Sequence, residues 1–226
     1  MQNLTLLTVN FNSNYMTFMM LKSFFKCIGD NFNYLIVDNS TNLNYSLVNS
    51  GMNVFDNTNN HITGNYGQCS KNHASTIDFA LNNLIKTKYV LLCDNDIFFK
   101  KSILSILPER EKYDCIGEIG WDDAPPNRLF PYFNLFDVEK FKKEKVHYFD
   151  PKRIIEPPPV GRYVGPRGSG TKCWYRDTGA SFYEDIKDSW NIKQIKLNDY
   201  IVHNKTHGQP KMTLNDFIIK YKDLNM

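Results

Sequence analysis

The sequence has few cysteines and no long hydrophobic segment, and both absences exclude classes of protein. Its 5 cysteines are odd in number and form no Cys-x-x-Cys pair, which argues against a disulfide framework and against a zinc knuckle. No apolar run approaches the roughly 20 residues that cross a membrane, and the N-terminus lacks the basic region and cleavage site of a signal peptide. We therefore expect reduced thiols, no integral membrane segment and a cytoplasmic location.

The sequence also lacks a strong charge of either sign. Its 27 basic and 24 acidic residues give a formal net charge of +3, which is too small to indicate nucleic-acid binding by itself. No internal repeat or low-complexity tract is visible. With 226 residues, 42% of them hydrophobic, the chain can bury one substantial core, and we expect a single domain over residues 1–226.

Strands and helices alternate over the first half of the chain. Apolar runs predict strands at 4–10, 34–37, 52–55 and around 90–92, and apolar residues at three- and four-residue spacing predict helices at 15–25 and 70–86. Such alternation implies right-handed crossovers, so we expect an α/β fold with a mostly parallel sheet flanked by helices. The predicted strands end at Asn10, Asp38 and Asp94, and ligands bind beyond such strand ends.

The second half of the chain is less regular. We expect a strand at 113–119, a helix at 137–145, a long loop at 156–170, a helix carrying Phe182, Ile186 and Trp190, a strand at 195–202 and a final helix at 213–221. A loop of this length is typical of a binding loop or of disorder. Its cations could close over a ligand or could simply be solvated; they are Arg162, Arg167, Lys172 and Arg176.

Two carboxylates one residue apart, Asp94 and Asp96, follow the predicted strand around 90–92. Such a pair suits a Mg²⁺ or Mn²⁺ ion that keeps open positions for water and phosphate oxygens. The alternative is an acidic turn that ends the strand and stays solvated. An EF-hand is excluded, because Phe98 and Phe99 occupy the loop positions that need an oxygen ligand and a glycine.

Three short motifs occur in order between Leu4 and Phe99. They are Asp38-Asn-Ser40 after the second strand, Asn65-x-Gly67 with Asn72 entering the helix, and Asp94-Asn-Asp96 after the next strand. Together they resemble family 2 glycosyltransferases of the GT-A fold. The resemblance implies a nucleotide-sugar-binding half over 1–100 and an acceptor-binding, catalytic half over 101–226.

The resemblance further implies that a nucleoside-diphosphate sugar, with UDP or GDP as its nucleotide, binds to the first half and that Asp38 hydrogen-bonds the base. The expected donor-binding residues are Asn10, Asn12, Asp38, Asn65, Gly67, Lys71, Asp94, Asn95 and Arg176. Three of them have ordinary structural alternatives. Asp38 could cap a turn, Gly67 could serve a backbone with positive φ, and Lys71 could lie on a solvated helix face.

The resemblance also assigns ligands to a Mn²⁺ or Mg²⁺ cofactor. Asp96 would bind the metal, and Asp94 would lie toward the ribose or a metal-bound water. A late histidine often completes such a site, and we expect His203 in this role, with His207 as the second choice. A histidine in this position could instead be structural.

An inverting transfer needs a base within hydrogen-bond reach of the acceptor hydroxyl. Asp177 follows Cys173-Trp-Tyr-Arg176 and precedes a predicted helix, and it is our expected base. It could instead be the N-cap of that helix. Glu184 and Asp185 are alternative bases. Trp121, with Asp122 and Asp123, ranks lower as a sugar-binding element.

These expectations together predict a metal-dependent glycosyltransferase that inverts the anomeric configuration of the sugar and acts on a glycan, lipid or protein acceptor. A sugar-phosphate nucleotidyltransferase would want a glycine-rich, basic loop after the first strand, and residues 10–14 contain neither glycine nor lysine. A non-catalytic carbohydrate-binding module stays open as an alternative. A dehydrogenase is disfavoured because no Gly-x-Gly-x-x-Gly follows the first strand.

Overall fold

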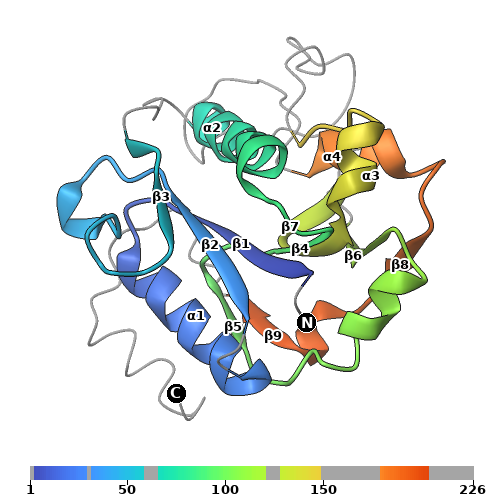
Figure 1. Ribbon diagram of the computed structural model, residues 1–226, viewed down its shortest axis with the longest axis horizontal. Coiled ribbons are helices and arrows are strands. Elements are labelled where there is room, and N and C mark those ends of the chain that lie inside the picture. The colour runs from blue at the N-terminus through green and yellow to red at the C-terminus, as the bar shows by residue number, and fades with distance from the viewer. Residues whose placement is uncertain (1–2, 30–31, 59–65, 121–127, 149–178, 204–226) are drawn as a thin grey trace, which may run out of the picture.

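A seven-stranded sheet forms the centre of the computed structural model (Figure 1). The structure describes residues 3–29, 32–58, 66–120, 128–148 and 179–203, and for residues 66–71 and 180 it describes the backbone but not the side chains. Its order is β3-β2-β1-β4-β7-β6-β8. The strands are β1 (Leu4–Asn10), β2 (Asn33–Asp38), β3 (Val54–Asp56), β4 (Tyr89–Leu92), β6 (Cys115–Gly120), β7 (Arg128–Asp137) and β8 (Ile192–Gln194). Neighbouring strands are parallel except that β7 is antiparallel to both β4 and β6, which confirms the mostly parallel sheet.

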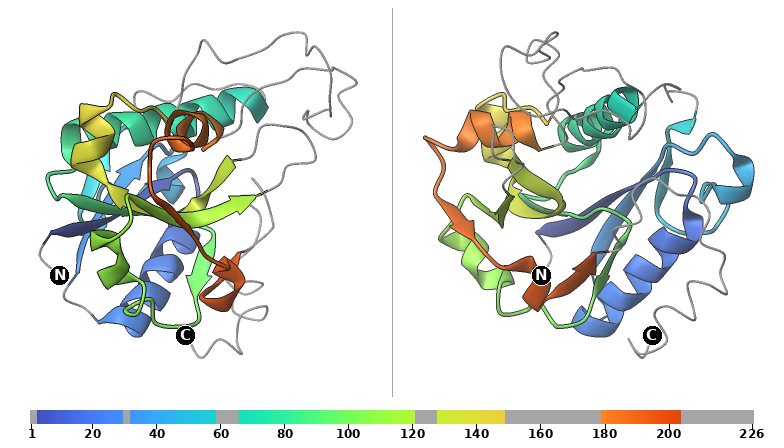
Figure 2. Two further views of the ribbon diagram at one scale, coloured as in Figure 1. Left: turned by 90° about the vertical axis from the view of Figure 1, so that its right-hand side faces the viewer. Right: turned by 180° about the vertical axis from the view of Figure 1, so that it is seen from behind.

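Helices cover both faces of this sheet, as expected for an α/β fold (Figure 2). One face carries α1 (Asn14–Ile28). The other carries α2 (Tyr66–Phe79) with its π-helical continuation η3 (Ala80–Leu84), α3 (Val138–Lys143) and α4 (Ala180–Ile186). Short 3-10 helices are η1 (Leu43–Tyr45), η4 (Leu107–Glu111) and η6 (Leu197–Asp199).

The apolar core is divided into two layers by the sheet. Alternate residues of a strand point to opposite faces, so Leu6 packs with Phe24 of α1, whereas Leu7 packs with Ile77 of α2. All residues of β1 and β4 are buried, Thr5 and Thr8 included, which explains why neither strand alternates between apolar and charged residues. The buried strands hold their polar carboxyl ends at one edge of the sheet.

A second sheet of two short strands brings distant parts of the chain together. β5 (Ile97–Phe99) pairs antiparallel with β9 (Ile201–His203), and Ile97 lies opposite His203. β5 is fixed to α1 because the backbone N–H of Phe99 donates to Ser23 Oγ at 3.0 Å. The last described residue therefore lies close to the turn that follows β4.

Several sequence-based boundaries are wrong. The strand predicted at 195–202 is instead η6 followed by β9, with β8 ending just before it, and α4 ends before Trp190. The helix predicted at 70–86 begins earlier, at Tyr66, so Gly67 lies in a helix rather than in a loop. β5 and β7 were not predicted. β7 contains Pro131, a residue that argues against a central strand, and β6 and β7 shift register beside it, between Gly117 and Ile119.

The predicted loop at 156–170 and the predicted helix at 213–221 lie outside the described residues. In the ranges that the structure does describe, no helix has the length and apolar character needed to span a bilayer.

Candidate functional site

Polar residues gather at the edge of the sheet where β1, β2 and β4 end. Asn10 and Asp38 are the last residues of β1 and β2 and face each other in register. The turn containing Asp94 and Asp96 follows β4 directly and leads into β5. This arrangement confirms that the predicted strand ends converge at one edge, the position where α/β sheets bind ligands.

The Asp38 carboxylate is fully buried and is already hydrogen-bonded by the protein. Oδ1 accepts from Asn10 Nδ2 at 3.1 Å and from the Ser40 N–H at 3.0 Å, and Oδ2 accepts from Ser46 Oγ at 2.7 Å and the Leu47 N–H at 2.6 Å. Burial raises the pKa of Asp38, but hydrogen bonds from Ser40, Ser46 and Leu47 outweigh it and the pKa is lowered. The contact with Ser40 is the turn-capping geometry that the sequence left open. A contact with a nucleotide base stays a prediction.

Asn10 and Asn95 link the ends of β1, β2 and β4 through the first turn of α1. Asn95 Nδ2 donates to Ser13 Oγ at 2.6 Å and to Thr17 Oγ1 at 3.0 Å. Thr17 Oγ1 donates in turn to Asn10 Oδ1 at 2.9 Å, and Asn10 Nδ2 reaches Asp38. Asn10 is completely buried. This network fixes the turn after β4 relative to the first two strands.

Asn12 holds the neighbouring loop. Its backbone has a φ of 49°, a left-handed conformation that asparagine tolerates better than most residues. Its side chain accepts from the N–H groups of Thr41 and Asn42, both at 2.9 Å, and donates to Thr41 Oγ1 at 2.8 Å. Asn12 therefore positions the loop that follows β2, and its role in donor binding stays a prediction.

The structure brings Asp96 and His203 together, as the metal-site hypothesis requires. His203 Nε2 lies 3.4 Å from Asp96 Oδ1, because β5 pairs with β9. That oxygen is buried and accepts no hydrogen bond from the described part of the chain. A carboxylate oxygen and an imidazole nitrogen at this separation are suitable ligands for Mn²⁺ or a similar ion.

Asp94 points to a different partner. His73, on α2, places Nε2 at 3.5 Å from Asp94 Oδ1. No group of three or more His, Cys, Asp or Glu side chains that could hold a metal occurs among the described residues. Among the described residues, Asp96 and His203 are therefore the two candidate ligands that lie together.

An aromatic row, not anticipated from the sequence, supports His203. The Tyr132 ring stacks on His203, with centroids 4.6 Å apart and an interplanar angle of 21°, and stacks on Phe130 at 4.9 Å. The Arg128 guanidinium lies over Phe130 at 5.3 Å. Burial, followed by the charge of Glu118, raises the pKa of Tyr132, so its phenol stays neutral. The sequence did contain a signal for this row, because residues 128, 130 and 132 are spaced two apart and therefore share one face of a strand.

The alternative bases Glu184 and Asp185 lie on α4, which packs on the face of the sheet opposite to α1. Glu184 pairs with Lys187 at 3.4 Å, and Asp185 accepts from the His147 N–H at 3.2 Å. These contacts do not join them to the Asp96–His203 pair, and their catalytic role stays a prediction.

Other candidate residues lie outside the described residues or are described by backbone alone. Gly67 and Lys71 have backbone in α2 only. The remaining ones lie outside: Asn65, Trp121, Asp122, Asp123, Arg162, Arg167, Lys172, Arg176, Asp177 and His207.

The chain matches no protein-family model and no curated protein. Solved structures resemble parts of it. TarS of S. aureus (residues 1–349) in complex with UDP is 16% identical with a TM-score of 0.44, over 65% of this chain and 50% of that one. WbbM, a bifunctional glycosyltransferase, is 10% identical with a TM-score of 0.46, over 63% and 33%. The galactosyltransferase LgtC, with donor and acceptor sugar analogues, is 11% identical with a TM-score of 0.43, over 62% and 59%. This chain thus spans about a third to three fifths of those proteins.

Proposed function

We propose that this chain is a glycosyltransferase that takes a sugar from a nucleoside-diphosphate sugar with the help of a divalent ion. The observation that carries the proposal is the contact between Asp96 and His203, at 3.4 Å, beyond the carboxyl end of β4. The sequence motifs around Asp38 and Asp94 support the same function by their resemblance to GT-A glycosyltransferases.

In this proposal, Asp96 and His203 would hold Mn²⁺ or Mg²⁺, which would supply positive charge beside a diphosphate leaving group. Asn95 keeps the turn in place through its bonds to Ser13 and Thr17. Asp94 would face the ribose or a metal-bound water. UDP and GDP are the proposed nucleotides, and a glycan, lipid or protein supplies the acceptor hydroxyl.

The finer chemistry belongs to the same proposal. Transfer is inverting, and Asp177 takes the proton of the acceptor hydroxyl, with Glu184 or Asp185 as the alternative base. Arg176 and the neighbouring cations would contact the phosphates of the donor. Replacement of Asp177 by Asn should lower kcat while leaving the dissociation constant of the nucleotide unchanged.

Nucleotide binding tests the proposal directly. UDP, GDP and CMP are added to the chain with and without Mn²⁺, and the unfolding temperature is measured. A nucleotide at 100 times its Kd stabilises the folded state by about 2.7 kcal/mol. We expect stabilisation by one nucleotide that depends on Mn²⁺ and that is lost in Asp96→Ala and His203→Ala.

Asp56→Ala is the matched control, because Asp56 is an exposed carboxylate at the end of the neighbouring strand β3. This variant should bind nucleotide as the parent does. The proposal is wrong if no nucleotide stabilises the chain, or if Asp96→Ala responds to Mn²⁺ and nucleotide as fully as the parent. Binding without release of nucleotide from any nucleotide sugar would favour the non-catalytic module instead.

A further inference from the structure

The outward side of α1 exposes large apolar side chains to solvent. Among the described residues, the large hydrophobic side chains that are exposed concentrate between residues 11 and 48. Tyr15 is 47% exposed and Phe18 is 51% exposed, while Leu43, in the neighbouring turn, is 85% exposed. Grouped exposed apolar side chains of this kind mark an interaction surface more often than scattered single ones do.

The opposite side of the same helix is already used for the core. Met20, Leu21 and Phe24 are buried against the sheet. The N-terminal half of α1 is therefore apolar both toward the core and toward solvent. A helix of this character is normally covered on both sides, by protein or by lipid. Within the described residues, packing covers the side of α1 that faces the sheet and leaves the outward side exposed.

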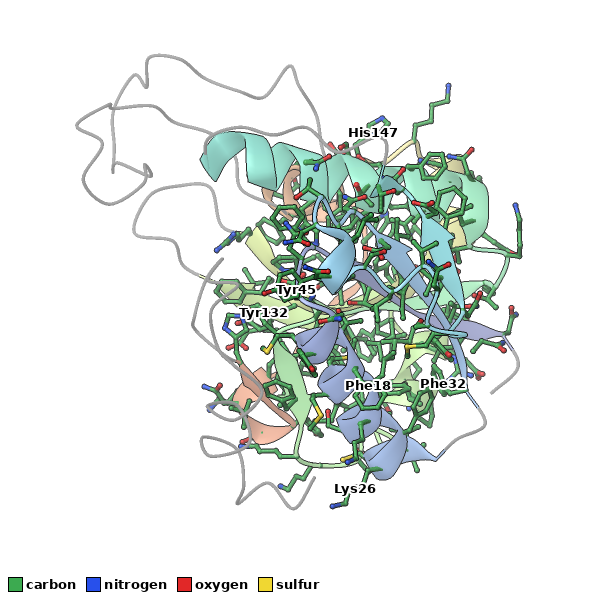
Figure 3. The ribbon with its side chains drawn as sticks, turned by 90° about the vertical axis from the view of Figure 1, so that its left-hand side faces the viewer. Phe18, Lys26, Phe32, Tyr45, Tyr132 and His147 are labelled. Carbon is green, nitrogen blue, oxygen red and sulfur yellow. The ribbon has the colours of Figure 1, made fainter. Side chains whose placement is uncertain are left out.

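The turn at η1 extends this surface beyond the start of α1. Asn14 Nδ2 donates to the Asn44 carbonyl at 3.3 Å, which places η1 beside the first turn of α1. Figure 3 looks onto this side of the molecule, with Phe18 and Lys26 labelled along α1 and Tyr45 near its N-terminal end. We call Tyr15, Phe18, Lys22, Lys26 and the η1 turn the α1 surface.

The charge of the α1 surface is of one sign. Lys22 and Lys26 are exposed and continue the stripe of Tyr15 and Phe18 at helical spacing. Neither residues 11–29 nor residues 39–55 contain an aspartate or a glutamate. Lysine side chains can bury their carbon stems in an apolar layer and extend the ammonium group to lipid phosphates.

We propose that the α1 surface binds the headgroup region of a bilayer that contains anionic lipid. Aromatic and leucine side chains enter the acyl boundary while lysines meet the phosphates, as in interfacial helices. A protein partner fits less well, because the cores of protein–protein interfaces are depleted in lysine. The inference is independent of the proposed function. It would, however, bring the candidate site near the bilayer, because Asn95 contacts Ser13 and Thr17 of α1.

Vesicle flotation with the full chain tests this inference. Vesicles of phosphatidylcholine alone are compared with vesicles containing phosphatidylglycerol, at fixed salt. We expect binding to the anionic vesicles only. The double variant Lys22→Gln/Lys26→Gln should bind roughly 30-fold more weakly, taking about 1 kcal/mol for each lysine. The double variant Tyr15→Ser/Phe18→Ser should also lose more than about tenfold in affinity.

Phe79→Ser/Lys86→Gln is the matched control, because both residues are exposed, Phe79 at the end of α2 and Lys86 just after η3, on the other face of the sheet. It should float as the parent does. Thermal unfolding of each variant checks that the fold is intact.

Three results would overturn the inference. They are failure of the parent to float with anionic vesicles, equal loss in the control and the α1 variants, and a concentration-dependent dimer that Tyr15→Ser/Phe18→Ser dissociates. The dimer would assign the surface to a second copy of the chain.

Discussion

The substitution Asp38→Asn should destabilise the fold because this carboxylate supports the edge of the sheet. Its two oxygens accept four hydrogen bonds inside the protein, and no part of the residue is exposed. The asparagine amide retains one oxygen acceptor, but its NH₂ group replaces the second oxygen and then faces the two donors that this oxygen accepted from. If the amide faces Ser46 and Leu47, the Ser46 hydroxyl can rotate to accept, but the Leu47 N–H cannot.

The magnitude follows from these contacts. One buried N–H without a partner costs about 1–3 kcal/mol, and loss of the charge from the remaining hydrogen bonds adds about 1 kcal/mol. A total of about 3 kcal/mol corresponds to a fall in Tm of roughly 6–12 °C for a chain of this size. Asp56→Asn is the control, since Asp56 is exposed and its hydrogen bonds within the described part of the chain come from Thr58, two residues away. It should change stability by less than about 1 kcal/mol.

The pH dependence gives a second readout of the same substitution. Because the pKa of Asp38 is lowered from its ordinary value of 3.8, the folded state holds this proton more weakly than the unfolded state. The stability that Asp38 contributes is therefore complete above the unfolded pKa and is lost as the pH falls through the lowered folded pKa. Asp38→Asn should flatten this part of the acid-unfolding curve.

Circular dichroism can monitor the urea and thermal unfolding of the parent, Asp38→Asn and Asp56→Asn. These curves measure both the loss of stability at neutral pH and its dependence on pH. The reasoning fails if Asp38→Asn unfolds within about 1 kcal/mol of the parent at neutral pH. A stable Asp38→Asn variant that no longer binds nucleotide would show that the carboxylate serves the ligand rather than the loop.

Two further predictions concern the aromatic row and a glycine. Tyr132→Leu should weaken Mn²⁺ binding roughly 2- to 10-fold in calorimetry, because His203 loses its stacked ring, whereas Tyr132→Phe should retain the affinity. Equal affinities in all three proteins would contradict a positioning role for Tyr132. Gly179→Ala should cost about 2 kcal/mol or more in thermal unfolding, since its φ is 88° and the new Cβ would meet the Leu129 carbonyl oxygen. Gly51 has a φ of 75° and open space around it, so Gly51→Ala should lose only the stability that the strained backbone conformation costs, about 1 kcal/mol. An equal loss in the Gly179 and Gly51 variants would refute the steric argument.

The sequence predicted the first half of the fold well because its signals are local. β1 was predicted with the observed bounds, and Asn10, Asp38 and Asp94 lie at or just after the carboxyl ends of strands that are rich in apolar residues. The same local signals could not separate a turn cap from a ligand contact at Asp38. That distinction depends on Ser46 and Leu47, whose donors reach the carboxylate only after the chain turns back through η1.

The rest of the site depends on contacts between segments that lie far apart in the sequence. His73 carries no motif of its own, and its position opposite Asp94 results from the packing of α2 over β4. His203 was identified by the family resemblance, but its support by Tyr132 depends on β7, a strand that Pro131 concealed. The irregularity of β7 therefore explains why the aromatic row was missed.

The pairing of β5 with β9 has a consequence for the order in which the protein is assembled. Ile97 leaves the ribosome long before its partner His203, so the two-stranded sheet must wait for nearly all of the described chain to be synthesised. Pairing over so long a separation is slow, because the intervening chain must first lose its entropy. A nascent or truncated polypeptide that ends before β9 would carry Asp96 without its imidazole neighbour, and under the proposed metal site such a fragment should bind Mn²⁺ more weakly than the full chain.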